Sequence, residues 1–337
     1  RSATFAADPA FQVPTGERQL FLDDVGVAKI ENLTRTMHRP DKKGAVIRPD
    51  VNMGEHAKQT RTTPLWNPQR KIFQFWDLYG NEPPVSNTNG YYESVDGLHW
   101  SKPEVGLVEY RGSKANNFVT VLLGDVQHRA ECIVRDESDP DPNRRYKTAT
   151  PNVFDEGKGG YAVSPDGIHW TEVSHPGISS GDEWNLTFDA REQLFLHYLK
   201  RRGTHGRAIW LTTSQDFSQW TEPELIFEAD DVDQTRGAER IKARLAEPRY
   251  QRLVGNDPSV YNVDVYHMCP FRYESAYFGM PAFYHAVCPA FENTNTDGFH
   301  VAELASSRNL KDWFRLGDRQ AFIEPSLGGC GAYDLTQ

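Results

Sequence analysis

Short apolar runs alternate with polar turns along nearly the whole chain. Residues 71–80, 89–97, 192–200 and 207–214 are rich in aromatic and β-branched residues and are bounded by Gly, Asn, Asp or Pro. This pattern is typical of β-strands joined by turns. One stretch, residues 235–247, favours a helix instead, and we expect it to form a surface excursion. No composition shift marks a linker, so we predict a single all-β domain over residues 1–337.

A short motif recurs four times. "ESVDGLHW" at 93–100 and "VSPDGIHW" at 163–170 are near-copies, and weaker copies stand at 213–220 and 306–313. Each copy has Ser, then Asp or Asn two residues later, and Trp six residues after the Ser. Asp accepts hydrogen bonds from backbone N–H groups two residues on, and Trp can pack between neighbouring sheets. We therefore interpret the motif as a structural turn. It resembles the Asp box of sialidases but is one residue shorter.

The same order of parts surrounds each motif, with three strands before it and one extended segment after it. Self-similar units of four strands predict a β-propeller. We place blades at about 59–110, 128–175, 182–228 and 260–325, with residues 18–30 as a closing outer strand. The sequence ends in "GGCGAYDLTQ", which is typical of the start of another inner strand. We expect a five-bladed propeller in which four blades are complete and the fifth is partly present, closed by missing residues or by a second chain.

Charge and cysteine content exclude several classes of protein. The formal net charge is −10 and no long Lys/Arg run is present, which argues against binding to nucleic acids or anionic membranes. No apolar stretch approaches the roughly 20 residues of a membrane span. The four Cys fit no zinc-binding spacing. Cys269 and Cys288 flank one predicted hairpin, and they either form a disulfide or remain buried thiols.

Ligands of a propeller gather at the mouth opposite the motif turns, where the inner strands begin. Acidic residues at these starts are therefore the catalytic candidates: Asp182, Glu131, Asp264, Glu55 and Asp334. Neighbouring side chains of a strand face opposite ways, so only one of Asp182 and Glu183 should point at the axis, and we favour Asp182. Glu131 either faces the axis or forms a salt bridge with Arg129 or Arg135.

Sugar binding combines aromatic faces with polar side chains. Alternation from residue 264 to 268 puts Asp264, Tyr266 and Met268 on one face and His267 on the other. The basic segment 200–207 should form the turn between the second and third strands of the third blade. This turn is either solvated or a contact for a uronate or sulfate group. The candidates for substrate binding are His56, Trp184, Tyr266, His267, His285, Arg202 and Arg207.

A family resemblance adds to this picture. The order of "QLFLDD", "LTRTMHRP", "SVDGLHWSKPEVGLVEY", "DPNRRYK" and "SPDGIHW" resembles bacterial secreted proteins related to glycoside hydrolase families 32 and 43. These are five-bladed propellers of the invertase and arabinanase type. The resemblance implies a secreted or periplasmic glycoside hydrolase that cleaves a poly- or oligosaccharide with paired carboxylates. Such chemistry needs no cofactor, and no motif indicates an axial Ca²⁺ or Na⁺.

The catalytic motifs of invertases are only partly present. Invertases carry Asn-Asp-Pro near the start, an Arg-Asp-Pro and a Glu-Cys-Pro. This chain has "HMCP" at 267–270, no Arg-Asp-Pro, and an Asn-Asp-Pro only at 256–258. These departures favour an alternative, a carbohydrate-binding propeller without catalysis. A third class, a protein-interaction scaffold, would have a flat mouth without a pocket.

Overall fold

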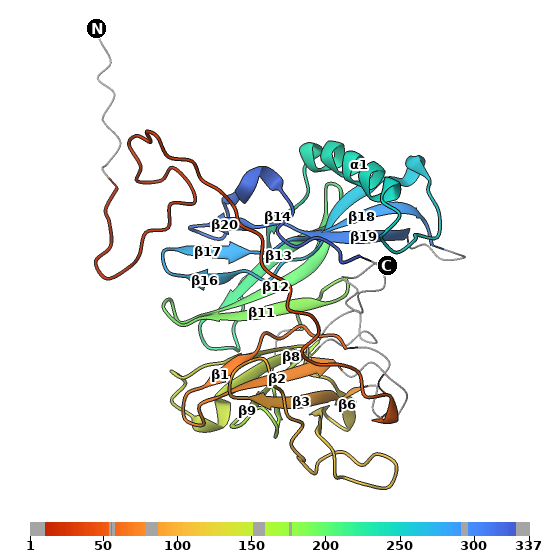
Figure 1. Ribbon diagram of the computed structural model, residues 1–337. Helices are drawn as coiled ribbons and strands as arrows, with labels where there is room; N and C mark the ends of the chain where they lie inside the picture. The colour runs from red at the N-terminus through yellow and green to blue at the C-terminus, as the bar shows by residue number, and fades with distance from the viewer. Residues whose placement is uncertain are drawn as a thin grey trace.

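The computed structural model describes residues 11–53, 55, 58–78, 87–150, 159–174, 177–290 and 296–327. Within this part, antiparallel sheets account for nearly all regular structure, and one α-helix is present. Figure 1 shows the sheets stacked along the molecule, with the sheets of residues 65–173 (β1–β10) at one end and those of residues 262–315 (β15–β21) at the other, while the N-terminal segment before β1 runs beside the C-terminal sheets. The prediction of a mostly β protein is therefore confirmed.

The first three sheets are meanders in which each strand pairs with its neighbour in sequence. The first sheet contains β1 (Leu65–Asn67), β2 (Ile72–Leu78), β3 (Asn89–Ser94) and β4 (Phe118–Val119). The second contains β7 (Cys132–Arg135), β8 (Tyr146–Thr150), β9 (Gly160–Ser164) and β10 (Thr171–Val173). The third contains β11 (Trp184–Asp189), β12 (Leu194–Gly203), β13 (Gly206–Ser214) and β14 (Glu224–Phe227). A hairpin of β5 (Val121–Leu123) and β6 (Val126–His128) joins the first two sheets. We expected the first blade to end at about residue 110, but its last strand, β4, lies at Phe118–Val119.

The C-terminal strands form two sheets, which together follow the order of one bent meander; we call the pair the fourth sheet. One half contains β15 (Asn262–His267), β18 (Ala282–Pro289) and β19 (Thr296–Ala302). The other contains β16 (Phe271–Tyr273), β17 (Ala276–Gly279), β20 (Ala305–Ser307) and β21 (Trp313–Arg315). Pro270 and Pro281 lie at the bend. Because proline has no N–H to donate, it interrupts the ladder of hydrogen bonds at this point.

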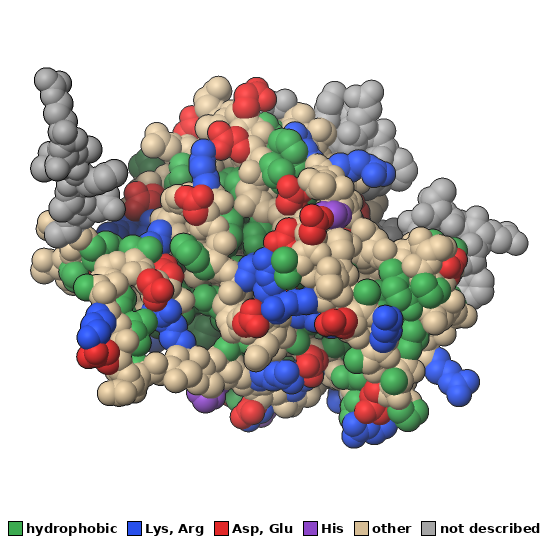
Figure 2. Space-filling view, turned by 90° about the horizontal axis from the view of Figure 1, so that it is seen from above, with side chains coloured by type: hydrophobic (Ala, Val, Ile, Leu, Met, Phe, Trp, Pro, Cys, Tyr) green, Lys and Arg blue, Asp and Glu red, His purple; other side chains and the backbone are tan. Residues whose placement is uncertain are grey.

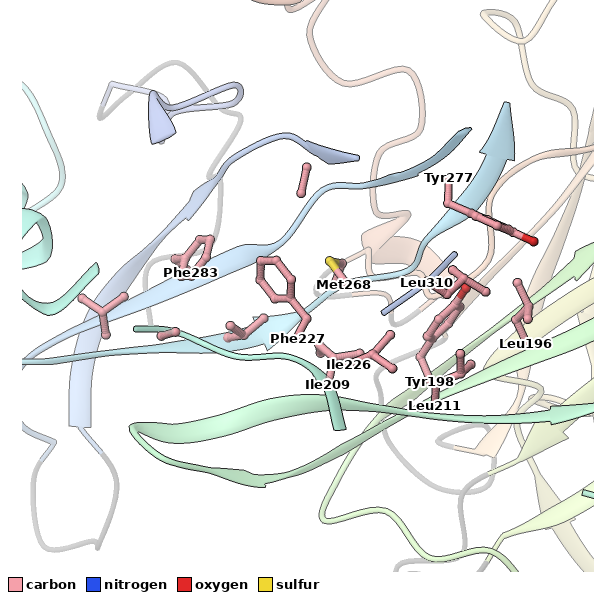
Figure 3. Packing of buried hydrophobic residues seen from close by; sticks show 14 residues of the cluster. Leu196, Tyr198, Ile209, Leu211, Ile226, Phe227, Met268, Tyr277, Phe283 and Leu310 are labelled. Carbon is pink, nitrogen blue, oxygen red and sulfur yellow. The ribbon is translucent and has the colours of Figure 1, made fainter. Parts of the chain in front are cut away.

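Three hydrophobic clusters join successive sheets face to face. One links the first and second sheets around Trp76 and Tyr146, and another links the second and third around Tyr161 and Trp184. The cluster drawn in Figure 3 joins the third and fourth sheets and includes Leu196, Tyr198, Ile209, Leu211, Phe227, Met268, Tyr277 and Phe283. Each large side chain that is fully buried contributes about 1.5–3 kcal/mol, so these interfaces hold the sheets in a fixed order.

The repeated motif forms the same turn in all four sheets. The Asp166 carboxylate accepts hydrogen bonds from the backbone N–H groups of Ile168 and His169, both at 2.8 Å. Asp96, Asp216 and Asn309 make the equivalent bonds in their own turns. The motif is therefore a structural turn, as predicted.

The tryptophan of the motif contacts the preceding sheet in the third and fourth sheets. Trp220 lies 5.5 Å from Tyr161 of the second sheet, and Trp313 lies 6.0 Å from Phe227 of the third, measured between ring centroids. Trp100, in the first sheet, packs instead on Phe75 of its own sheet. The motif thus closes a turn and helps to connect neighbouring sheets.

The helix α1 (Asp231–Ala246) begins four residues earlier than expected because Asp230 caps it. The Gln234 side chain exchanges two hydrogen bonds with the backbone of Val263 in β15. Ile241 is fully buried among residues of the fourth sheet. The helix therefore lies at the surface, as expected, and covers one face of this sheet (Figure 1). The short 3-10 helices are Val51–Met53, Pro142–Arg144, Pro258–Val260 and Leu316–Arg319.

The N-terminal segment 18–30 does not form the outer strand that we expected. It consists of turns and extended chain without strand pairing. Asp23 accepts a hydrogen bond from the backbone N–H of Val25, which closes a turn, and it also pairs with Arg308 of the fourth sheet. Leu20 contacts Ser275 through its backbone N–H. The segment therefore runs beside the fourth sheet (Figure 1) but is attached by side chains rather than by a ladder.

The described cysteines Cys132, Cys269 and Cys288 are all free thiols. Cys269 follows β15 and Cys288 is near the end of β18, and these strands run antiparallel with His267 opposite Ala282. The two thiols therefore lie at opposite ends of the strand pair, which rules out the disulfide considered from the sequence. In the described part of the chain, no helix has the length and apolar character needed to cross a membrane.

Candidate functional site

A cavity of about 750 Å³ opens where β11 and β15 begin, beside the turn between β12 and β13. Its lining includes five residues that were predicted from the sequence to belong to one site: Asp182, Asp264, Tyr266, Arg202 and Arg207. Lys200, Arg201 and Tyr284 also line it. The turn motif at Ser214 is at the other end of β13, roughly 23 Å from Arg207 along an extended strand. The cavity and the turn motifs therefore occupy opposite ends of the third sheet.

Asp182 and Glu183 lie in a bend that precedes β11. The backbone N–H of Gly181 donates to the carbonyl of Lys200 at 2.7 Å, which fixes this bend against β12. The Lys200 ammonium contacts Asp182 at 3.1 Å and Glu183 at 2.5 Å. Strand alternation does not apply before the strand starts, so both carboxylates reach the same cation. Of the two, only Asp182 lines the cavity, as favoured from the sequence, although both carboxylates contact Lys200.

Glu183 is the more enclosed carboxylate, and it was not among the residues predicted from the sequence. Its side chain is 12% exposed, against 53% for Asp182. It forms ion pairs with Arg61 and Lys200, and His267 Nε2 lies 2.9 Å from its Oε2. Three basic groups from different sheets therefore surround it. The only sequence signal was its position beside Asp182 at the start of an inner strand.

Lys200 is the central cation of the cluster, and it too was missed as a site residue. Its side chain is only 5% exposed. Burial lowers the pKa of the ammonium to about 8, although the negative charge of Asp182 acts in the opposite direction. The Nζ atom also lies 3.7 Å from the centre of the Tyr266 ring, within the range of a cation–π interaction.

Asp264 is held by the turn between β12 and β13. Its Oδ2 accepts hydrogen bonds from the backbone N–H of Arg207 at 3.2 Å and from the Arg207 Nε at 2.8 Å. A Cβ atom on Gly206 would lie 2.7 Å from this oxygen, so only glycine permits the approach. The Arg207 guanidinium lies 4.5 Å from the centre of the Tyr266 ring and 4.7 Å from that of Tyr284.

A β-bulge between Val265 and His267 changes the expected alternation. Asp264 and Tyr266 line the cavity as predicted, but Met268 is 1% exposed and packs in the core with Val265. His267 Nδ1 lies 3.1 Å from the Asn185 amide oxygen. Burial lowers the pKa of this ring well below its usual value, so it is neutral near pH 7. His267 therefore lies behind the cavity, against Glu183, and not in its lining.

Glu131 lies at the start of β7 and is 1% exposed. It pairs with Arg129 at 3.1 Å, while Arg135 pairs with Glu137 instead. Burial raises the pKa of the Glu131 carboxyl, and the positive charges of Arg129 and Arg61 lower it by smaller amounts. Its Oε2 atom has no hydrogen-bond partner among the described residues. Asp182 is close enough to raise this pKa further, so Glu131 belongs to the same electrostatic cluster.

Glu55 belongs to a different cluster, at the edge of the first sheet. It pairs with Lys58 at 2.7 Å and with Lys102 at 3.3 Å. Lys58 also contacts Asp77 of β2 at 2.6 Å. Glu55 does not line the cavity, so the prediction that it joins Asp182 and Asp264 there was wrong. Two further candidates, His56 and Asp334, lie outside the described residues.

Trp184 and His285 are core residues, which contradicts their predicted role in substrate binding. Trp184 is 1% exposed and packs 4.8 Å from the ring of His197. His285 is fully buried and stacks on Phe299 at 4.8 Å, and burial lowers its pKa to about 3. Neither ring is accessible to a sugar. The described residues also contain no group of three or more His, Cys, Asp or Glu that could hold a metal ion.

Comparison with known proteins gives distant structural neighbours. No protein-family model matches the sequence, and no curated protein matches it. A solved structure described as a glycoside hydrolase matches with a TM-score of 0.39 and 13% identity, over 76% of this chain and 72% of that one. The β-fructofuranosidase of Schwanniomyces occidentalis complexed with fructosyl-erythritol matches with a TM-score of 0.43 and 12% identity, over 77% of this chain. The fructofuranosidase from the same organism complexed with fructose gives 0.37 and 11%, over 72%.

This chain covers 46% and 47% of those two fructofuranosidase chains, about half their length. The similar structures are glycoside hydrolases, in agreement with the resemblance expected from the sequence.

Proposed function

We propose that this protein is a glycoside hydrolase that cleaves a poly- or oligosaccharide in the cavity lined by Asp182 and Asp264. The observation that supports this most directly is the presence of two carboxylates, Asp182 beside the third sheet and Asp264 in the fourth, in the lining of one cavity of about 750 Å³. Glu131 of the second sheet does not line the cavity but is close enough to Asp182 for the two charges to interact. Hydrolysis of a glycosidic bond uses two carboxyl groups, one protonated and one ionised. Tyr266 and Tyr284 add aromatic surface of the kind that lines sugar-binding sites.

We assign the role of ionised carboxylate to Asp182 and that of proton donor to Glu131. Asp182 is the more exposed of the acids around Lys200, and its carboxylate lies 3.1 Å from this ammonium at the cavity wall. Glu131 has a raised pKa and an oxygen without a partner in the described part of the chain, which suits a carboxyl group that retains its proton. An enclosed carboxyl group that keeps its proton beside a more exposed carboxylate is a usual arrangement for acid and base roles. Glu183, paired with Lys200 and Arg61, keeps these two cations in position.

We further propose that the four sheets are blades of a five-bladed propeller and that the protein is secreted or periplasmic. The meander order within each sheet and the face-to-face packing of successive sheets support the propeller. Location outside the cytoplasm follows from the proposed substrate, because a polysaccharide does not cross a membrane.

The test is a screen of the purified protein against plant and marine polysaccharides, with detection of new reducing ends. We expect at least one polymer to yield reducing ends at a rate proportional to protein concentration. The variant Asp125→Asn is a matched control, because Asp125 is exposed in the turn between β5 and β6, away from the cavity. Products with a terminal double bond, seen by ultraviolet absorbance, would indicate elimination and contradict hydrolysis.

A second function, carbohydrate binding without catalysis, is favoured by one specific observation. Asp182, Asp264, Glu183 and Glu131 each have a basic partner at 3.1 Å or less. Carboxylates neutralised in this way can serve as hydrogen-bond acceptors for sugar hydroxyls without taking part in proton transfer. Saturable binding of a polymer that yields no reducing ends would support this function over hydrolysis.

A further inference from the structure

We propose that the cavity recognises an anionic group on its sugar ligand, a carboxylate or a sulfate, through Arg202 and Arg207. This inference rests on the proposed carbohydrate ligand and names its chemical class. It does not depend on which carboxyl groups carry out the reaction. Four observations support it: the charge balance of the lining, the partners of each cation, the register of the hairpin, and the support of Arg207 by aromatic rings.

The lining of the cavity is more basic than the rest of the protein. Four cationic residues, Lys200, Arg201, Arg202 and Arg207, face only two carboxylates, Asp182 and Asp264. The chain as a whole has a formal net charge of −10. Figure 2 shows that Lys and Arg side chains are interspersed with Asp and Glu side chains on the face seen from above. A local excess of positive charge in an acidic protein favours an anionic ligand.

The cations of the cavity differ in how they are neutralised. Lys200 contacts Asp182, and Arg207 contacts Asp264. Arg201 donates to the backbone carbonyl of Ser179. Arg202 is exposed, and its side chain forms no hydrogen bond or ion pair with the described residues. The charge of Arg202 is therefore available to a ligand.

The register of the hairpin places two arginines side by side. Arg202 of β12 pairs directly with Arg207 of β13, one step before the closing pair Gly203 and Gly206. Like charges at directly opposed positions of two strands destabilise the pairing. Asp264 offsets only one of these two charges, through Arg207 Nε. An anion bound between the two guanidinium groups would offset the other.

Arg207 is also held in an orientation that suits bidentate binding. Its guanidinium packs over the rings of Tyr266 and Tyr284, and Asp264 accepts from its Nε. The two terminal nitrogens have no partner among the described residues, so they can donate in parallel to a carboxylate or sulfate. Asp264 Oδ1 is buried and lacks a donor in the same part of the structure. A hydroxyl next to the anionic group on a sugar ring could supply that donor.

The experiment measures binding of the full chain to polymers that differ only in charge. Asp182→Asn serves as the background, so that binding is measured without turnover. The probes are polygalacturonate, the same polymer after carboxyl reduction, a sulfated galactan, and that galactan after desulfation. We expect tighter binding to one charged polymer than to its neutral counterpart. The pair of polymers that shows this difference identifies the recognised anion as a carboxylate or a sulfate.

The variant Arg202→Gln should weaken binding of the charged polymer about tenfold or more, because it removes charge-assisted hydrogen bonds. Binding of the neutral counterpart should not change. Arg252→Gln is the matched control, since Arg252 is exposed and does not line the cavity. Equal binding of charged and neutral polymers, or an equal loss in both arginine variants, would overturn the inference.

The outcome is separable from the test of hydrolysis. Charge-dependent binding that requires Arg202, without release of reducing ends by the wild-type protein, would refute the hydrolase and retain the anion site. Hydrolysis of neutral polymers with no effect of Arg202→Gln would retain the hydrolase and refute the anion site.

Discussion

The two ends of the third sheet use carboxylates in opposite ways. At one end of β13, the Asp216 carboxylate accepts hydrogen bonds from the N–H groups of Ser218 and Gln219, each at 2.8 Å. At the other end, Asp264 binds Arg207, which lies 57 residues away in the sequence. The first arrangement is complete within a single turn. The second exists only when the third and fourth sheets have packed together.

The difference appears in the pKa values. Backbone hydrogen bonds lower the pKa of Asp216 to about 2, so that its charge is stabilised where it stands. In the cavity, burial acts against charge, lowering the pKa of Lys200 to about 8 and raising that of Glu131. Ionisable groups held away from their preferred charge state are typical of functional sites. We conclude that the turn end stabilises the fold, while the cavity end maintains charges at some cost to stability.

The largest effect that we expect comes from Asp182→Asn. The amide keeps the shape of the side chain but loses the charge, so turnover of a substrate found in the screen should fall by about 10²–10⁴-fold. Glu183 still pairs with Lys200 in this variant, so the melting temperature should change little. Initial rates and thermal unfolding measure the two effects. Turnover equal to that of Asp125→Asn would remove Asp182 from the catalytic pair.

The next prediction concerns pH dependence through Lys200. Its pKa of about 8 means that the ammonium loses its proton as the pH rises above 8. Asp182 and Glu183 then lose their shared cation, so activity should fall about tenfold for each pH unit above that value. In Lys200→Arg the cation stays charged, and this decrease should move to higher pH. An identical profile for the variant and the wild type would show that Lys200 does not control activity.

Most of the fold could be predicted from the sequence because it depends on local patterns. Alternation of apolar residues located the strands of the third sheet, and the spacing of Ser, Asp and Trp identified the turns. The hairpin between β12 and β13 was also located correctly, from its glycines and its arginines. Interactions of this kind are formed between residues that are close in the sequence.

Parts of the site could not be predicted, because they depend on departures from regular geometry and on distant contacts. The bend before β11 brings both Asp182 and Glu183 to Lys200, and alternation within a strand cannot represent such a bend. The bulge in β15 turns His267 toward Glu183 for a similar reason. Arg61 reaches Glu183 only through the packing of the sheets. No local pattern in the sequence encodes this contact.

A smaller effect is expected for Glu131 in the pH dependence of stability. Because its pKa is raised in the folded state, the folded protein binds more protons than the unfolded chain above the usual carboxyl pKa. The stability that this group contributes is therefore lost as the pH rises through its folded pKa. Urea unfolding at pH 5 and pH 8 should show a smaller loss of stability in Glu131→Gln than in the wild type. An equal loss in both proteins would show that Glu131 does not retain its proton.

The smallest effects are expected for substitutions in the repeated turn motif. The motif of the fourth sheet, which has Asn309 in place of Asp, provides a natural comparison. Asp166→Ala removes the acceptor for two backbone N–H groups and should cost about 1 kcal/mol of unfolding free energy, with turnover per folded molecule unchanged. Asp166→Asn should cost less, because Asn309 makes the same two bonds in the fourth sheet with an amide oxygen. Denaturant unfolding of both variants, together with their turnover, measures this difference. A loss of turnover without a loss of stability in either variant would place Asp166 in the functional site and remove the contrast between the two ends.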